Sequence, residues 1–208
     1  MRKNSKKVHI YAHFVHSSRQ KEKKEDKSWQ CCFLFVLLRL YKEAMRYEEI
    51  IDKYYPDDDD LRRLLIHHSR QVAQRCQLIA AGHPELNLDT EFLEEGAMLH
   101  DIGIRWCDAP GIYCHGTEPY IRHGAIGGEL LRKEGLERLA RVCERHTGTG
   151  LPGFEPQTLE EQVVCYADKF YSKSHPERER TVEQAAQSLE KFGHEGVEKF
   201  LRWAAMFE

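Results

Sequence analysis

No apolar run in the sequence is long enough to cross a bilayer. The stretch Cys31–Leu38 is interrupted by Arg39, far short of the roughly 20 residues that a membrane helix needs. The basic region before it is too long for a signal peptide, and no small-residue cleavage site follows. We therefore expect no membrane span and a cytoplasmic protein, with a peripheral membrane contact through residues 29–38 as the alternative.

The chain also has no Cys-x-x-Cys pair. Its seven cysteines are an odd number, and Cys31 and Cys32 are adjacent. Cys76, Cys143 and Cys165 fall in apolar helical stripes, where a reduced thiol behaves as a small hydrophobe. This usage predicts a reducing compartment without a disulfide framework or a structural zinc site.

The sequence also has no large excess of positive or negative charge, since its net charge is only −3. This net charge gives no reason to expect electrostatic attraction of the whole surface to nucleic acid or membrane, so we expect no nucleic-acid partner. Residues 1–28 nevertheless hold nine Lys or Arg against three Asp or Glu. Such runs are usually solvated tails, and nucleic-acid binding by this segment is the alternative.

Cleaner globular patterning begins at Met45. We interpret residues 1–44 as an N-terminal extension, either disordered or the product of a mis-set start, and residues 45–208 as the folded domain. Peptides from upstream of Met45 in the native protein would contradict a mis-set start. The length fits one domain of ordinary size, which can bury a substantial core.

Sustained alternation of Val, Ile and Thr is absent, so the sequence predicts no strand and an all-α fold. A loop is expected at 102–118, where its length suits a segment that shapes a site. A second loop is expected at 147–156. The expected helices cover 46–54, 58–81, 89–101, 119–134, 136–146, 158–172 and 181–207, the last with a break near Gly193.

Several histidines and aspartates lie on apolar helical faces. His68 shares a face with Leu65 and Val72, whereas its neighbour His67 falls on the polar face. Buried polar or charged groups cost several kcal/mol each when unpaired, and a divalent cation would remove that cost. The other side chains in this position are His100, Asp101, His123, His146 and Asp168.

Each of these residues taken alone also has a structural interpretation. A core histidine is more often hydrogen-bonded to a carbonyl than bound to a metal. An inward aspartate near a helix end, such as Asp168, often caps the helix or pairs with a nearby cation. Their occurrence together, on five expected helices, favours a metal centre.

These residues resemble the HD-domain metal-dependent phosphohydrolases. His100-Asp101-Ile102-Gly103 matches the motif of that superfamily, His68 in His-Ser-x-x-Val-Ala resembles its first metal histidine, and Asp168 in Ala-Asp-Lys its last aspartate. The resemblance covers about residues 60–172. It implies a compact helical bundle of the HD-domain type over 45–208. It also implies a metal held by His68, His100, Asp101 and Asp168, and hydrolysis of a phosphate ester, often of a nucleotide.

His123 and His146 resemble the additional histidines of binuclear members, in which the aspartate of the HD pair, here Asp101, bridges two metals. We therefore expect one or two divalent ions, with Mn, Fe, Co, Zn and Mg not distinguished by mixed nitrogen and oxygen ligands. The chain departs from many members at Ile104, where they carry Lys. It also lacks the Gly-Tyr-Pro motif of cyclic-di-nucleotide phosphodiesterases, and it looks more like small HD proteins, some of which cleave dinucleoside polyphosphates.

The resulting expectation is a phosphohydrolase that uses metal-activated water on a small phosphorylated substrate, a nucleotide in the first instance. Asp101 is expected to orient the nucleophile and take its proton. Lys169 and Arg122 are the first choices for phosphate contacts among the cations near the motifs, ahead of Arg105, Arg145 and Lys173. A surface position is the alternative for each. For the aromatics of the 102–118 loop, a lid and a structural anchor remain equal alternatives.

An alternative of a different class is a catalytically silent metal- or nucleotide-binding sensor or scaffold with the same fold. Turnover abolished by His100→Ala or Asp101→Ala would distinguish the enzyme from the scaffold. The sequence leaves a homo-oligomer open.

Overall fold

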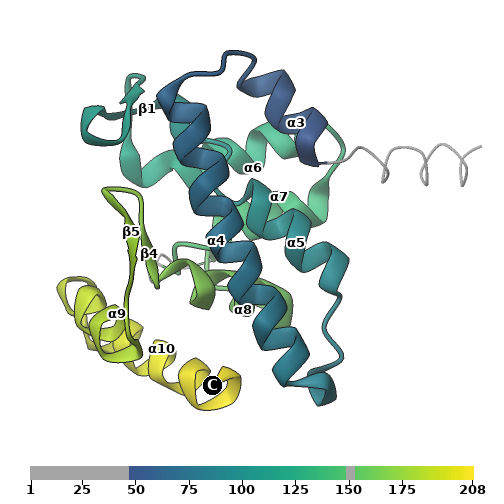
Figure 1. Cartoon of the computed structure of the whole chain (residues 1–208), viewed down its shortest axis with the longest axis vertical. Helices are drawn as coiled ribbons and strands as arrows, with labels where there is room; N and C mark the ends of the chain where they lie inside the picture. The colour runs from purple at the N-terminus through teal and green to yellow at the C-terminus, as the bar shows by residue number, and fades with distance from the viewer. Residues whose placement is uncertain (1–46, 149–152) are drawn as a thin grey trace, which may run out of the picture. The chain divides into compact units, whose positions relative to one another are not determined.

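Helices make up most of the chain that the computed structural model describes, residues 47–148 and 153–208 (Figure 1). The expectations for residues 1–44 lie outside this part. The all-α class predicted from the sequence is confirmed. The α-helices of the described residues are α3 (Tyr47–Tyr54), α4 (Asp60–Gly82), α5 (Thr90–Leu99), α6 (His123–Lys133), α7 (Glu137–Arg145), α8 (Leu159–Asp168), α9 (Val182–Leu189) and α10 (His194–Phe207).

Side-chain caps begin several of these helices. Asp59 accepts a hydrogen bond from the Arg62 amide at the start of α4, and Asp89 accepts one from the Phe92 amide at the start of α5. Thr158 and Glu161 form the reciprocal capping box that their spacing predicts for α8. Capping satisfies amides that have no partner within the helix, and so fixes where the helix begins.

The prediction that the chain has no strand is wrong, because two small sheets are present. In the first, β1 (Cys107–Ala109) lies between β2 (Cys114–His115) and β3 (Glu118–Pro119). In the second, β4 (Tyr171–Ser172) pairs antiparallel with β5 (His175–Glu179). These strands are too short and too polar to show the alternation that identifies a half-buried strand.

Two expected helix boundaries also need correction. Pro119 was expected in the first turn of a helix, but it ends β3, the 3₁₀ turn η4 (Tyr120–Arg122) follows, and α6 begins at His123. The helix expected to reach residue 172 ends at Asp168, which leaves the following residues to enter the β4–β5 hairpin. Four further 3₁₀ turns in the described residues shape the connections, η1 (Pro84–Leu86), η2 (Ile104–Trp106), η3 (Pro110–Ile112) and η5 (Glu190–Phe192).

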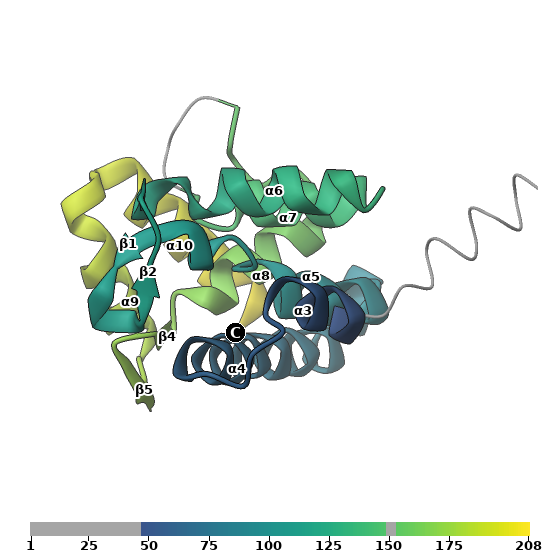
Figure 2. The same ribbon diagram turned by 90° about the horizontal axis from the view of Figure 1, so that it is seen from above.

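The central helices pack in layers. α5 and α8 contact each other and lie between α4 on one side and α7 on the other, and α6 packs along α7 (Figure 2). Leu65, Val72 and Leu93 are fully buried in this core, as the apolar stripes predict. α9 and α10 contact each other, and α10 also packs against α8. No helix in the described residues combines the length and apolar character needed to cross a membrane.

Candidate metal centre

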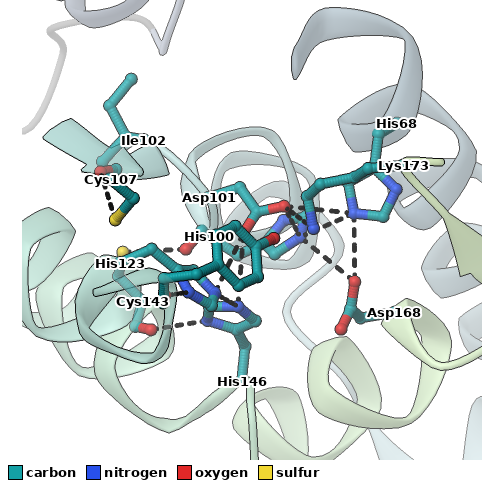
Figure 3. A network of polar contacts seen from close by, with 12 residues as sticks. His68, His100, Asp101, Ile102, Cys107, His123, Cys143, His146, Asp168 and Lys173 are labelled. Carbon is teal, nitrogen blue, oxygen red and sulfur yellow. Dashed lines mark hydrogen bonds and ion pairs between the residues drawn. The ribbon is translucent and has the colours of Figure 1, made fainter. Parts of the chain in front are cut away.

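Six buried or nearly buried side chains converge from five helices (Figure 3). His68 comes from the middle of α4, and the others come from helix ends, where the chain turns toward a common point. His100 caps the end of α5, followed by Asp101; His123 opens α6, His146 caps the end of α7, and Asp168 ends α8.

The Oδ2 atom of Asp101 faces the first group of ligands. It lies 3.2 Å from His68 Nε2 and 3.1 Å from His100 Nε2. Asp168 completes this group, because its Oδ1 lies 3.1 Å from His68 Nε2 and 3.5 Å from His100 Nε2. Side chains from three helices and the turn after α5 therefore bring four ligand atoms together.

The other oxygen of Asp101 faces a second group. Oδ1 lies 3.4 Å from the Nε2 atoms of both His123 and His146, which are 3.0 Å from each other. Figure 3 shows Asp101 between this pair and the side chains of His68 and Asp168. The two ligand groups thus share one carboxylate.

Backbone carbonyls orient three of the imidazoles. His100, His123 and His146 each donate their Nδ1–H to a carbonyl three residues earlier, which leaves each Nε2 directed at Asp101 and its neighbours. The acceptors, each at 2.6 Å, are Ala97, Tyr120 and Cys143.

A divalent cation fits this donor set. Neither oxygen of Asp101 receives a hydrogen bond of good geometry from the described residues, although the carboxylate is fully buried. Such a group is costly unless cations compensate it; the Lys173 ammonium contacts Oδ2, whereas Oδ1 faces the imidazoles of His123 and His146. The separations between ligand atoms also suit ions bound at about 2.0–2.2 Å from each ligand. The residues that would hold the ions are those of the two groups around Asp101.

The charges of the metal-free centre follow from its burial and its carboxylates. Burial alone would lower the pKa of His100, but Asp101 and Asp168 outweigh it and raise that pKa to about 9. Burial dominates at His146 and lowers its pKa to about 3. Burial opposes charge on Asp101 as well, yet the Lys173 ammonium and His100 hold its pKa well below the usual range. Asp101 is therefore anionic at neutral pH.

Lys173 makes the most direct cationic contact with the centre. It extends from the β4–β5 hairpin, and its Nζ lies 2.5 Å from Asp101 Oδ2. The sequence ranks Lys173 behind Lys169 and Arg122, because position along the chain does not show that the hairpin packs against α4 and brings Lys173 to Asp101. Its position five residues after Asp168 was the only signal, and the hairpin was not predicted.

The two first-choice cations lie in different places. Lys169 is near the centre, with its Nζ 2.9 Å from Asp168 Oδ2 and 3.0 Å from the His146 carbonyl oxygen. Arg122 is not brought to the centre, because its side chain is 52 % exposed and pairs with Glu118 at 2.6 Å. Arg105 also points away, toward Asp57 at 3.6 Å.

Close backbone approach explains the glycine of the HD motif. A Cβ on Gly103 would lie 2.1 Å from the His123 carbonyl oxygen and 2.6 Å from the Gly127 amide nitrogen. Only glycine allows the turn after α5 to pass so near the start of α6. This contact brings Asp101 and His123 to the same centre, and helix packing likewise accounts for the small residues of α6.

A cavity of about 630 Å³ opens beside the centre. His123, His146 and Asp168 line it, together with Lys169 and Lys173. The 102–118 segment contributes Ala109, Gly111 and Ile112 to the wall. Of its aromatics, Trp106 packs edge-on against Tyr54, with ring centroids 6.0 Å apart, which is an anchoring contact. Tyr120, which sequence reasoning missed, stacks on His123 at 4.6 Å between centroids and lines the cavity.

Residues 65–172 match the HD domain, which is more than half of the chain, and the chain belongs to the HD-domain family. The match includes all six ligand candidates. The resemblance stated from the sequence is confirmed, and HD domains in general are metal-dependent phosphohydrolases.

The curated relatives are proteins of different kinds. The chain is 29% identical over 121 residues to tRNA (cytidine(56)-2'-O)-methyltransferase of Thermoplasma volcanium, covering 52% of the chain and 32% of that protein. It is 33% identical over 124 residues to an uncharacterized protein of Methanocaldococcus jannaschii, covering 49% and 67%. It is 30% identical over 141 residues to ribonuclease Y of Acidothermus cellulolyticus, covering 65% and 26%.

The chain therefore spans about a third of the methyltransferase and about a quarter of the ribonuclease. Their names refer to RNA, so they give no support to the expectation that nucleic acid is not involved. No solved structure matches the chain.

Proposed function

We propose that the chain is a metal-dependent phosphohydrolase acting on a phosphate ester or anhydride, with a nucleotide as the substrate. One observation carries this proposal: the two oxygens of a single buried carboxylate, Asp101, face two separate groups of metal-capable ligands. A divalent cation bound there would supply Lewis-acid activation of water and of the phosphate group. The HD-family match supports the same reaction class.

Two lysines provide cationic contacts for a phosphate group at the cavity. Burial works against the charge of Lys169 and Lys173, but the carboxylates of Asp168 and Asp101 respectively outweigh it and raise the pKa of both ammonium groups. Both lysines remain charged at neutral pH and line the cavity. We assign them to the non-bridging phosphate oxygens; Arg122, which does not line the cavity, has no such role in this proposal.

Asp101 takes an orienting role in this scheme. Its depressed pKa makes it a weak proton acceptor near neutral pH, so the expectation that it removes a proton from water is not retained. Its fixed position between four imidazoles suits it to hold ligands and water in place. His123 and His146 have lowered pKa values because of burial and are therefore neutral, as metal ligation requires.

The test is metal-dependent phosphate release by the full chain. The protein is stripped with a chelator, Mn, Fe, Co, Zn or Mg is restored singly, and mononucleotides, a dinucleoside polyphosphate and a cyclic dinucleotide are offered. We expect turnover that depends on metal and falls by at least about a hundredfold in His68→Ala and Asp168→Ala. Tight metal binding without turnover of any panel member would contradict the hydrolase and favour the sensor or scaffold.

A further inference from the structure

The cavity beside the metal centre is larger than one phosphate group requires. Its volume of about 630 Å³ lies within the roughly 300–1,000 Å³ range of small-molecule sites. The HD-family match ends at residue 172, yet residues 173–192, here called the distal wall, supply much of the cavity lining. Its members include Lys173, Ser174, Arg180, Ser188, Lys191 and Phe192.

The side chains through which the distal wall lines the cavity include three cations and no carboxylate. Arg180 and Lys191 line the cavity, and no carboxylate in the described residues forms an ion pair with either. Lys169 and Lys173 also line the cavity but pair with Asp168 and Asp101, so the local excess of positive charge comes from Arg180 and Lys191. This local excess occurs in a chain of net charge −3, so it marks a site for an anion.

Arg180 lies next to the metal centre without joining it. Its amide donates to the Phe170 carbonyl at 2.9 Å, and its Nη1 donates to the Lys169 carbonyl at 3.1 Å. This contact fixes the guanidinium beside the residue that follows the ligand Asp168. A guanidinium has five N–H donors, and the others are available to an anion in the cavity. Arg180 therefore offers a second anion contact, separate from those of Lys169 and Lys173.

The distal wall also contains an exposed aromatic side chain, Phe192. Phe192 is 59 % exposed, lines the cavity, and also lines a neighbouring hollow of about 170 Å³. The Lys191 Nζ lies 4.9 Å from the centroid of its ring. An exposed aromatic ring beside cations is the combination on which nucleic-acid bases stack next to bound phosphates.

We propose that the distal wall is a second substrate subsite, in which Arg180 and Lys191 bind an additional phosphate and Phe192 stacks on the base. The inference rests on the proposed function, which places the scissile phosphate at the metal centre. The substrate class is then a nucleoside flanked by two phosphates, the chemistry shared by a free nucleoside bisphosphate and a nucleic-acid strand.

Calorimetric titration of the full chain tests this subsite. AMP and adenosine 3',5'-bisphosphate are titrated into the metal-free and the Mn²⁺-loaded protein, with ligand integrity checked by chromatography. We expect the bisphosphate to bind at least about tenfold more tightly than AMP. The double variant Arg180→Met/Lys191→Met should lose this advantage while its affinity for AMP stays within about twofold of the original.

Phe192→Leu separates stacking from charge. This substitution should lower the affinity for both nucleotides by about tenfold and leave the affinity for inorganic pyrophosphate unchanged. Lys133→Met is the matched control, since Lys133 is an exposed cation at the end of α6 that does not line the cavity. It should change none of these affinities.

Equal affinity for AMP and the bisphosphate, or an advantage that survives in the double variant, would overturn the proposal. A strand of four adenylates identifies the source of the ligand: tighter binding than the bisphosphate indicates nucleic acid, and weaker binding indicates the free nucleotide. Because binding is measured without turnover, absence of hydrolysis would contradict the proposed function and leave this result standing.

Discussion

At the scale of single residues, the backbone orients the imidazoles of the site. Three histidines donate Nδ1–H to backbone carbonyls at 2.6 Å, so each presents Nε2 toward Asp101. The Nδ1 atom of His68 has no such partner among the described residues. The imidazoles of His100, His123 and His146 are therefore positioned before any ion binds, which reduces the ordering that metal binding requires.

Lys173 competes with a metal cation for Asp101, because its ammonium lies 2.5 Å from Oδ2. Lys173→Met should tighten Mn²⁺ binding about tenfold or more, since a buried like charge is removed. The same change should raise the KM for a phosphorylated substrate, because a phosphate contact is lost. Metal titration and steady-state kinetics measure the two effects. Lys173→Arg keeps the charge and serves as the control; unchanged metal affinity in Lys173→Met would refute the competition.

Metal affinity should increase with pH. The pKa of His100 is raised to about 9 in the metal-free protein, so this imidazole is protonated at neutral pH and must lose a proton to bind metal. The apparent affinity should rise about tenfold per pH unit from pH 6 and level off near pH 9. Calorimetry in buffers of different ionisation enthalpy also counts the released proton. An affinity that is flat over this range would exclude the protonated His100.

Helical periodicity separates His68 from His67, and the structure buries the first at 1 % exposure and leaves the second exposed. The same reasoning could not rank the cations. Arg122 immediately precedes His123, but neighbouring residues at the start of a helix point in different directions. Lys173 reaches Asp101 only because a hairpin folds back, and that tertiary contact leaves no periodic pattern.

At the scale of elements, the turn after α5 passes in close backbone contact with the start of α6. A Cβ on Gly103 would lie 2.1 Å from the His123 carbonyl oxygen, so Gly103→Ala forces backbone to move. We expect the free energy of unfolding to fall by about 1–3 kcal/mol. His123 should shift together with α6. This shift should lower the metal affinity of the ligand group formed by Asp101, His123 and His146.

Chemical denaturation and metal titration measure these two effects of Gly103→Ala. Gly82→Ala is the control, because a Cβ at the end of α4 meets nothing within 4 Å. Equal stability of the two variants would show that the close approach is not a constraint.

The helices were predictable because caps and apolar stripes act locally. Asp89 and the Thr158–Glu161 capping box begin α5 and α8 near the expected positions. The strands were not predictable, because β1 to β4 have only two or three residues and β5 is the polar sequence HPERE. Their pairing partners lie across turns whose geometry the sequence pattern does not specify.

At the scale of the whole described domain, the site depends on convergence of distant segments. The ligands run from His68 to Asp168, and each helix contributes only one or two of them. Residues beyond the HD-family match then close the far side of the cavity. The candidate metal centre thus lies within the HD-family match and the distal wall lies outside it, and we expect substrate preference to be determined at that wall.

The most direct test of the central claim is the metal stoichiometry of the full chain after loading with Mn²⁺ and removal of free ion. The two groups that share Asp101 predict two ions per chain in the wild type, one in His68→Ala, one in His146→Ala and none in Asp101→Ala. Circular dichroism establishes that each variant is folded. A wild-type chain that binds no ion, or Asp101→Ala with the full complement, would contradict a metal centre built around Asp101.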